Sequence, residues 1–181
     1  MRELFISVKR YSIGLLVVIG GIGLAMAISP LSISGRGSDG EIIAEGAGTT
    51  LIHGGTGAPS FTPVITTIAF HAERTGSGVT GSFDCLALMP EANTGSQSGQ
   101  FTVNAMNVVG QVTGLTVSGN TATLTGTSTI TGLGAGPNVS FTFVVHRGGP
   151  GATAVLTVSS LPTVPFHELL VEGSFRVHGE D

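Results

Sequence analysis

The chain has little cysteine, tyrosine and positive charge, and it has no tryptophan: its 181 residues include one Cys, one Tyr, seven Lys and Arg together, and no Trp. Because Cys85 is alone, no intrachain disulfide can form, and a folded domain must gain its stability from its core. So few cations cannot neutralise many phosphates, which argues against nucleic acid and anionic membranes as partners. A carbohydrate-binding aromatic platform would have to consist mainly of Phe.

The N-terminal segment has the three parts of a secretory signal peptide. Three basic residues lie among the first ten, an apolar stretch follows over Ser12–Ile28, and Ala25-Met26-Ala27 offers a small-x-small cleavage site. A membrane-spanning helix needs about 20 apolar residues, and this stretch is shorter and contains four glycines. We therefore expect a signal helix over residues 1–27 that is cleaved after export, with an uncleaved membrane anchor as the alternative.

The rest of the chain suits one folded domain. Without residues 1–27 it carries four arginines against ten carboxylates, a net charge of −6 with His neutral. Val, Ile, Leu and Phe recur throughout, whereas disordered chains have low hydrophobicity. Residues 28–40 lack periodicity and predict a flexible linker, so the domain is expected over residues 41–181.

Beyond residue 40, apolar and polar residues alternate with the period of half-buried strands, and no stretch keeps the spacing of an amphipathic helix. The predicted inward-facing sets are Val64, Thr66, Ile68, Phe70 and Ala72; Val79, Phe83, Cys85, Ala87 and Met89; Phe101, Val103, Ala105 and Val109; Val139, Phe141, Phe143 and Val145; Ala152, Ala154, Leu156 and Val158; and Leu169, Val171, Phe175 and Val177.

The stretch 112–132 contains ten Ser or Thr residues and no charge, yet its pattern predicts a hairpin and not a flexible tract. Gly119-Asn120 suits a two-residue type II′ turn, in which the first central residue takes a positive φ. Threonines alternate with small and aliphatic residues after that turn, as in a strand. The inward-facing residues would be Leu115, Val117, Ala122, Leu124, Gly126, Ser128 and Ile130.

These patterns predict an all-β domain, a single antiparallel β-sandwich or meander barrel of about eight or nine strands, after the N-terminal signal helix. Strands separated by turns without crossover helices favour antiparallel pairing. The alternation alone leaves open whether the sheet closes.

Five successive motifs resemble the post-COAP family of secreted bacterial β domains, whose function is uncharacterised. They are "EGAGTTLIHGGTGAP", "IAFHAERTGSGVTGSFDCLAL", "GLTVSGNTATLTGTSTITG", "FTFVVHRGGPGATAVLTV" and "LLVEGSFRVHG", spanning residues 45–178. The chain departs from the family pattern at Asp84-Cys85-Leu86 and in the "EANTGSQSG" loop. The resemblance implies export and a β domain, and it implies no known catalytic residue.

Residues able to carry chemistry are few. His71 and Glu73 share a strand face that His146 could approach, but no His-x-His or Cys-x-x-Cys motif accompanies them, so we expect a solvated face and no metal site. Cys85 falls on an apolar face, where a thiol behaves as a small buried hydrophobe and not as a nucleophile. An enzyme would need two or more of Asp84, Glu73, His71 and His146 in one cleft. We expect no catalytic activity and no cofactor.

Two functions remain. The first is a secreted, non-catalytic β domain with a structural, adhesive or interaction role toward an unknown extracellular protein or surface. The alternative is a barrel that carries a small apolar ligand. A carrier would have a cavity lined by aromatic rings, whereas a structural module would have the same rings packed against each other. The rings concerned are Phe70, Phe83, Phe141, Phe143 and Phe175.

Overall fold

The computed structural model describes residues 41–52, 64–90 and 101–179. Their eight strands are β1 (Ile42–Ile52), β2 (Ile65–Thr75), β3 (Gly78–Pro90), β4 (Phe101–Ser118), β5 (Thr121–Gly132), β6 (Gly136–His146), β7 (Thr153–Val158) and β8 (Phe166–His178). The predicted signal helix and linker, residues 1–40, lie outside the described residues.

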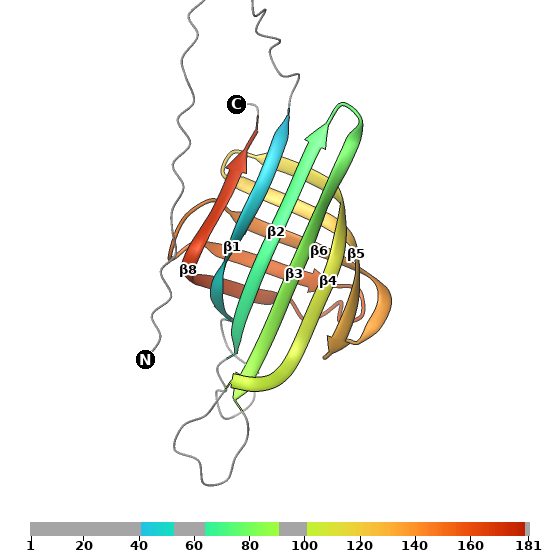
Figure 1. Ribbon diagram of the computed structural model, residues 1–181, viewed down its shortest axis with the longest axis vertical. Helices are drawn as coiled ribbons and strands as arrows, with labels where there is room; N and C mark the ends of the chain where they lie inside the picture. The colour runs from blue at the N-terminus through green and yellow to red at the C-terminus, as the bar shows by residue number, and fades with distance from the viewer. Residues whose placement is uncertain (1–40, 53–63, 91–100, 180–181) are drawn as a thin grey trace, which may run out of the picture. The chain divides into compact units, whose positions relative to one another are not determined.

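The strands form a closed meander barrel. Each pairs antiparallel with the next along the chain, and β8 returns to pair with β1, as their adjacent positions in Figure 1 show. β1 to β4 cross the front of the barrel steeply, the strands that follow β4 pass behind them at a wide angle, and β8 returns to the front beside β1 (Figure 1). The all-β prediction is confirmed, and of its two forms the barrel is the one observed.

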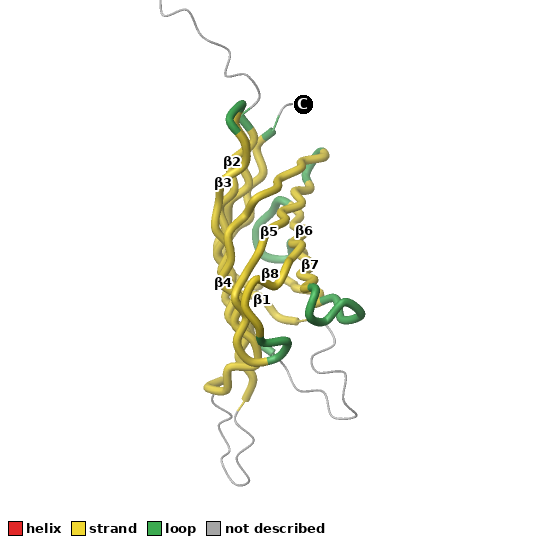
Figure 2. The backbone as a smooth tube through the Cα atoms, turned by 90° about the vertical axis from the view of Figure 1, so that its right-hand side faces the viewer, coloured by secondary structure: helices red, strands yellow, loops and turns green. Residues whose placement is uncertain are grey.

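The described part of the chain consists of strands and short connections, as the tube in Figure 2 shows. Among these residues, no helix is long and apolar enough to cross a membrane.

The Ser/Thr-rich stretch forms the predicted hairpin between β4 and β5. Ser118 pairs with Thr121 across the turn, and Gly119 has a φ of +56°, the sign that the first central residue of a type II′ turn requires. The inward set of β5 is buried as predicted, with Ala122 and Leu124 fully buried, while its threonines are half-buried or exposed.

Five strands place their side chains as the alternation predicts. β2, β3, β5, β6 and β7 direct the predicted apolar sets inward, and Cys85 is buried among them. The five phenylalanines named above form a cluster with ring centroids 4.9–5.6 Å apart between neighbouring rings. This packing fills the interior around them and contributes about 0.5–1.5 kcal/mol per ring pair beyond the burial of apolar area.

The predicted inward face of β4 is wrong over its middle part. Met106, Val108 and Val112 are buried there, whereas Val109 is exposed. Val103 keeps the predicted phase, because it pairs with Met89, whose side chain packs against the core. The side chain of Phe101 lies outside the described residues. A register shift between Val112 and Gly114 leaves one extra residue in β4 opposite β5. Opposite β3, Ala105 is a second extra residue, because Ala87 pairs with Met106 and Leu88 with Asn104. Each bulge exchanges the two faces of a strand, so only the segment between the two bulges departs from the predicted phase.

The predicted inward face of β8 is wrong over its first half, also because of a bulge. Leu169 and Val171 are 42% and 43% exposed, while Glu168 and Leu170 are buried. Opposite β1, Thr49 pairs with Glu172 and Thr50 with Leu170, so Val171 is the extra residue of a bulge.

Gly173 supports this bulge. Its φ of +110° suits glycine alone, and a Cβ there would lie 2.2 Å from the carbonyl oxygen of Ala47. The strand thus reverses its faces close to this glycine, and Phe175 and Val177 beyond it point inward as predicted.

Candidate ligand-binding cavity

A cavity of about 440 Å³ lies at one end of the barrel, where β1, β3, β5 and β7 end and β2, β4, β6 and β8 begin. Its lining is almost wholly apolar and comes from β1, β3, β4, β5, β7 and β8, with Val64 just before β2 and Leu133 just after β5. The lining residues are Ile52, Val64, Cys85, Ala87, Met89, Val103, Asn104, Ala105, Met106, Gly132, Leu133, Leu156, Phe166 and Glu168.

Glu168 is the one acidic side chain among these lining residues, and it is only 2% exposed. Its neighbours across the sheet are Ile52 on β1 and Ala154 on β7. The hydroxyl of Thr50, a fully buried side chain of β1, donates a hydrogen bond to Oε2 of Glu168. The β8 bulge places this carboxyl in the interior. Without the bulge, the side chain of residue 168 would lie on the outward face of β8.

Burial raises the pKa of Glu168 from 4.5 to about 7, since an apolar environment disfavours the charged form. The hydrogen bond from Thr50 opposes this rise, because it stabilises the carboxylate. The nearby Thr66 hydroxyl acts in the same direction, although its buried Oγ1 completes no hydrogen bond in the described structure. The carboxyl therefore exchanges its proton near neutral pH.

Cys85 is the other titratable side chain in the described lining. Burial raises the pKa of its thiol well above the usual value, and the negative charge of Glu168 raises it further. The thiol therefore stays protonated, and it is a poor nucleophile. A carboxyl with a pKa near 7 is able to transfer protons, but the described lining offers no second charged or basic group to act with it.

The five predicted ligand-contacting rings lie elsewhere in the interior. Phe70, Phe83, Phe141, Phe143 and Phe175 are buried against one another, and none of them lines this cavity. The interior thus has two parts. One is filled by packed aromatic rings, and the other is a void with mainly aliphatic walls, the ring of Phe166 and one carboxyl.

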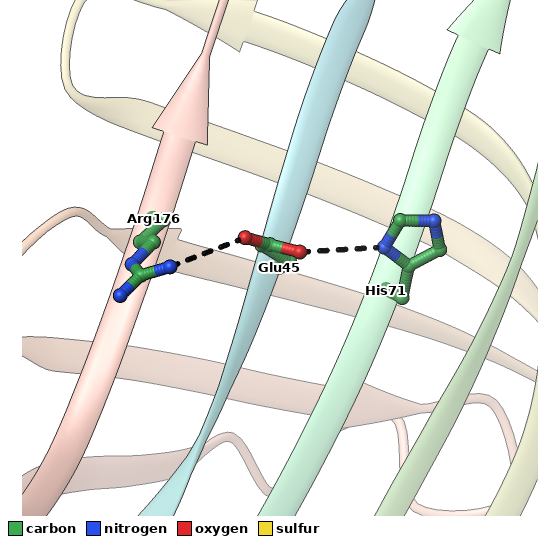
Figure 3. Close-up of polar contacts among 3 residues, drawn as sticks. All are labelled: Glu45, His71 and Arg176. Carbon is green, nitrogen blue, oxygen red and sulfur yellow. Dashed lines mark ion pairs between the residues drawn. The ribbon is translucent and has the colours of Figure 1, made fainter. Parts of the chain in front are cut away.

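The residues considered for a metal or catalytic site lie on the outside of the barrel. Figure 3 shows Glu45 of β1 between two partners, with its carboxylate 3.8 Å from Nδ1 of His71 on β2 and 3.7 Å from Arg176 on β8. All three side chains are at least 41% exposed, and such surface ion pairs contribute at most about 1 kcal/mol.

His146 does not approach His71. Its Nδ1 lies 2.9 Å from the hydroxyl of Thr121 on β5. Asp84 is exposed, and Glu73 is half-buried on the outer face. Within residues 41–52, 64–90 and 101–179, no group of three His, Cys, Asp or Glu side chains is arranged to hold a metal ion. His53 lies outside the described residues.

Glu168 is the residue that sequence reasoning missed. A regular alternation through β8 placed it opposite the apolar set, on the solvent side. The available signal was Gly173 within the strand, because an isolated glycine in a strand pattern indicates a bulge. Assigning a bulge to this position would have predicted that the inward and outward faces of β8 exchange there.

Comparison with known proteins finds no matching family model, no similar curated protein and no similar solved structure.

Proposed function

We propose that this protein is an exported β-barrel that binds a small, mainly apolar molecule in the cavity at the end of the barrel. The observation that carries the proposal is the cavity of about 440 Å³, with apolar walls and one buried carboxyl. Small-molecule sites occupy about 300–1,000 Å³ and combine apolar walls with a few polar groups. An eight-stranded barrel is just wide enough to hold one small ligand.

A structural or adhesive role is the second candidate. The packed phenylalanine cluster supports it, because tight ring packing is what a rigid scaffold needs. The cavity favours ligand binding instead, since a void of this size forfeits packing contacts that a pure scaffold would gain. Export through the signal peptide and the likeness to post-COAP domains stay predictions, and either function is compatible with them.

The proposal is tested by titrating 1-octanol into the full-length chain by calorimetry and repeating the titration with Ala87→Phe. Ala87 is buried and lines the cavity, so a phenyl ring there should fill part of the void and weaken binding at least about tenfold. Ala69→Phe is the matched control, because Ala69 is exposed on the outer face of the neighbouring strand β2. Equal binding by all three proteins, or failure of the unaltered protein to bind octanol and related alkyl probes, would contradict the proposal.

A further inference from the structure

We propose that the ligand is a hydrophobic amine whose ammonium group pairs with the carboxylate of Glu168. This inference rests on the proposed function and specifies its ligand class. Three observations support it: the position of the carboxyl, the hydroxyls behind it, and the absence of a cationic side chain from the described lining of the cavity.

The carboxyl occupies the position of a ligand anchor. Glu168 lines the cavity although it is only 2% exposed, and the other lining side chains are almost all apolar. Buried charges in proteins are paired, because an isolated ion loses its hydration without compensation. A ligand with a positive head group and an apolar body would supply the missing charge and fill the void at the same time.

The polar groups behind Glu168 suit its charged form. The hydroxyl of Thr50 donates a hydrogen bond to Oε2 of Glu168. The hydroxyl of Thr66 is buried close to this carboxyl and has no hydrogen-bond partner in the described structure. Neither threonine is part of the cavity lining, and both side chains are fully buried, so their hydroxyls lie in the packed interior behind the carboxyl. Hydroxyl donors at this position stabilise a carboxylate, and they would hold it ready for a cation.

The protein itself supplies no cation to this site. The described lining contains no Lys, Arg or His. Arg176, on the same strand as Glu168, is largely exposed and pairs with Glu45 on the outer face. A fatty acid or another anionic ligand is therefore disfavoured, because it would bring a second negative charge beside the carboxyl in an apolar environment. A neutral alcohol would donate one hydrogen bond to the carboxylate but would not supply the positive charge that balances it.

The pH dependence of amine binding should follow the titration of Glu168. The elements packed around it contribute Thr50 from β1, Thr66 from β2, Cys85 from β3 and Ala154 from β7, and of these only the protonated thiol is titratable. An alkylamine stays protonated to about pH 10, as lysine does. Amine affinity should therefore rise about tenfold between about pH 6 and about pH 8, as the carboxyl with a pKa of about 7 loses its proton.

The experiment compares n-octylamine, 1-octanol and octanoate by calorimetry against the full-length chain at about pH 8. These probes share an alkyl chain and differ in the charge of the head group. We expect octylamine to bind at least about tenfold more tightly than octanol, and octanoate to bind most weakly. Glu168→Gln should remove the advantage of octylamine while octanol binding persists. Glu172→Gln is the matched control, since it makes the same change at an exposed position of the same strand.

The outcomes separate the two proposals. If octanol binds and octylamine binds no tighter, or if octanoate binds best, the amine inference is overturned and ligand binding in the cavity stands. If none of the three probes binds the unaltered protein, the proposed function fails and the inference fails with it. Should Glu168→Gln not fold, the pH dependence of octylamine binding to the unaltered protein decides, because a flat profile would exclude pairing with this carboxyl.

Discussion

The stability of the barrel should fall as the pH rises from about 5 to about 8, because a proton leaves Glu168 in this interval. The carboxyl has a pKa of about 7 in the folded state and 4.5 as the ordinary value that the unfolded chain would show. Folded protein therefore holds this proton more tightly than unfolded protein does. The associated stability is fully present below about pH 4.5 and is lost as the pH rises through about 7.

The size of the effect follows from the two pKa values. Their difference, from 4.5 to about 7, corresponds to about 3 kcal/mol in the free energy of unfolding, most of it lost between about pH 5 and about pH 8. Replacing Glu168 with Gln keeps a similar volume and removes the titrating group. The variant should therefore show a flatter profile, and the difference between the two profiles should grow by about 2–3 kcal/mol toward acid pH.

Urea denaturation followed by circular dichroism, at a series of pH values, measures both profiles. All other titratable groups are present in both proteins, so their contributions cancel in the difference. Glu172→Gln controls for the loss of one carboxylate, and it should keep the profile of the unaltered protein. Parallel profiles for the unaltered protein and Glu168→Gln would refute the reasoning, since they would mean that Glu168 titrates alike in the folded and unfolded states.

Four further outcomes are expected. Phe143→Ala should lower the free energy of unfolding by about 3–5 kcal/mol in urea denaturation, because this fully buried ring packs against two other phenylalanines. Gly173→Ala should cost about 1–3 kcal/mol in the same assay, whereas Gly76→Ala, with open space around its Cβ, should cost less than about 1 kcal/mol. Cys85 should react with Ellman's reagent far more slowly in native protein than in urea-unfolded protein, since its thiol is buried and protonated. Mass spectrometry of exported protein should give a chain that begins after Ala27; an intact N-terminus would favour the anchor.

Regular strands were predictable from the sequence to the level of single side chains. In β2 and β5, inward and outward residues follow the predicted order throughout, because each keeps one phase along its length. The turn at Gly119 was also predictable, since its residue types fit one turn geometry. In such segments local patterning and tertiary structure agree.

Strands β4 and β8 show where sequence patterning fails. The alternation predicted one continuous inward face in each, and extra residues reverse it along part of the strand. A bulge depends on register with a partner strand, which a single sequence does not reveal. The error in β8 hid Glu168, so the candidate site could not be predicted. The closure of the sheet into a barrel could not be predicted from the sequence either, because β1 and β8 are distant in sequence and their pairing is a long-range contact.

Closure of the ring has a consequence for how this chain behaves among its own copies. Only 10% of the residues are charged, and strands rich in Thr and Val would readily pair with strands of other molecules. In the described barrel every strand has a hydrogen-bonded neighbour on both sides, so no strand is left as an edge strand. The shortest ladder is that between β7 and β8, which runs only from Thr153 to Leu156. Opening there would create two edge strands at once, so we expect pairing between copies of this chain to begin with the loss of this ladder.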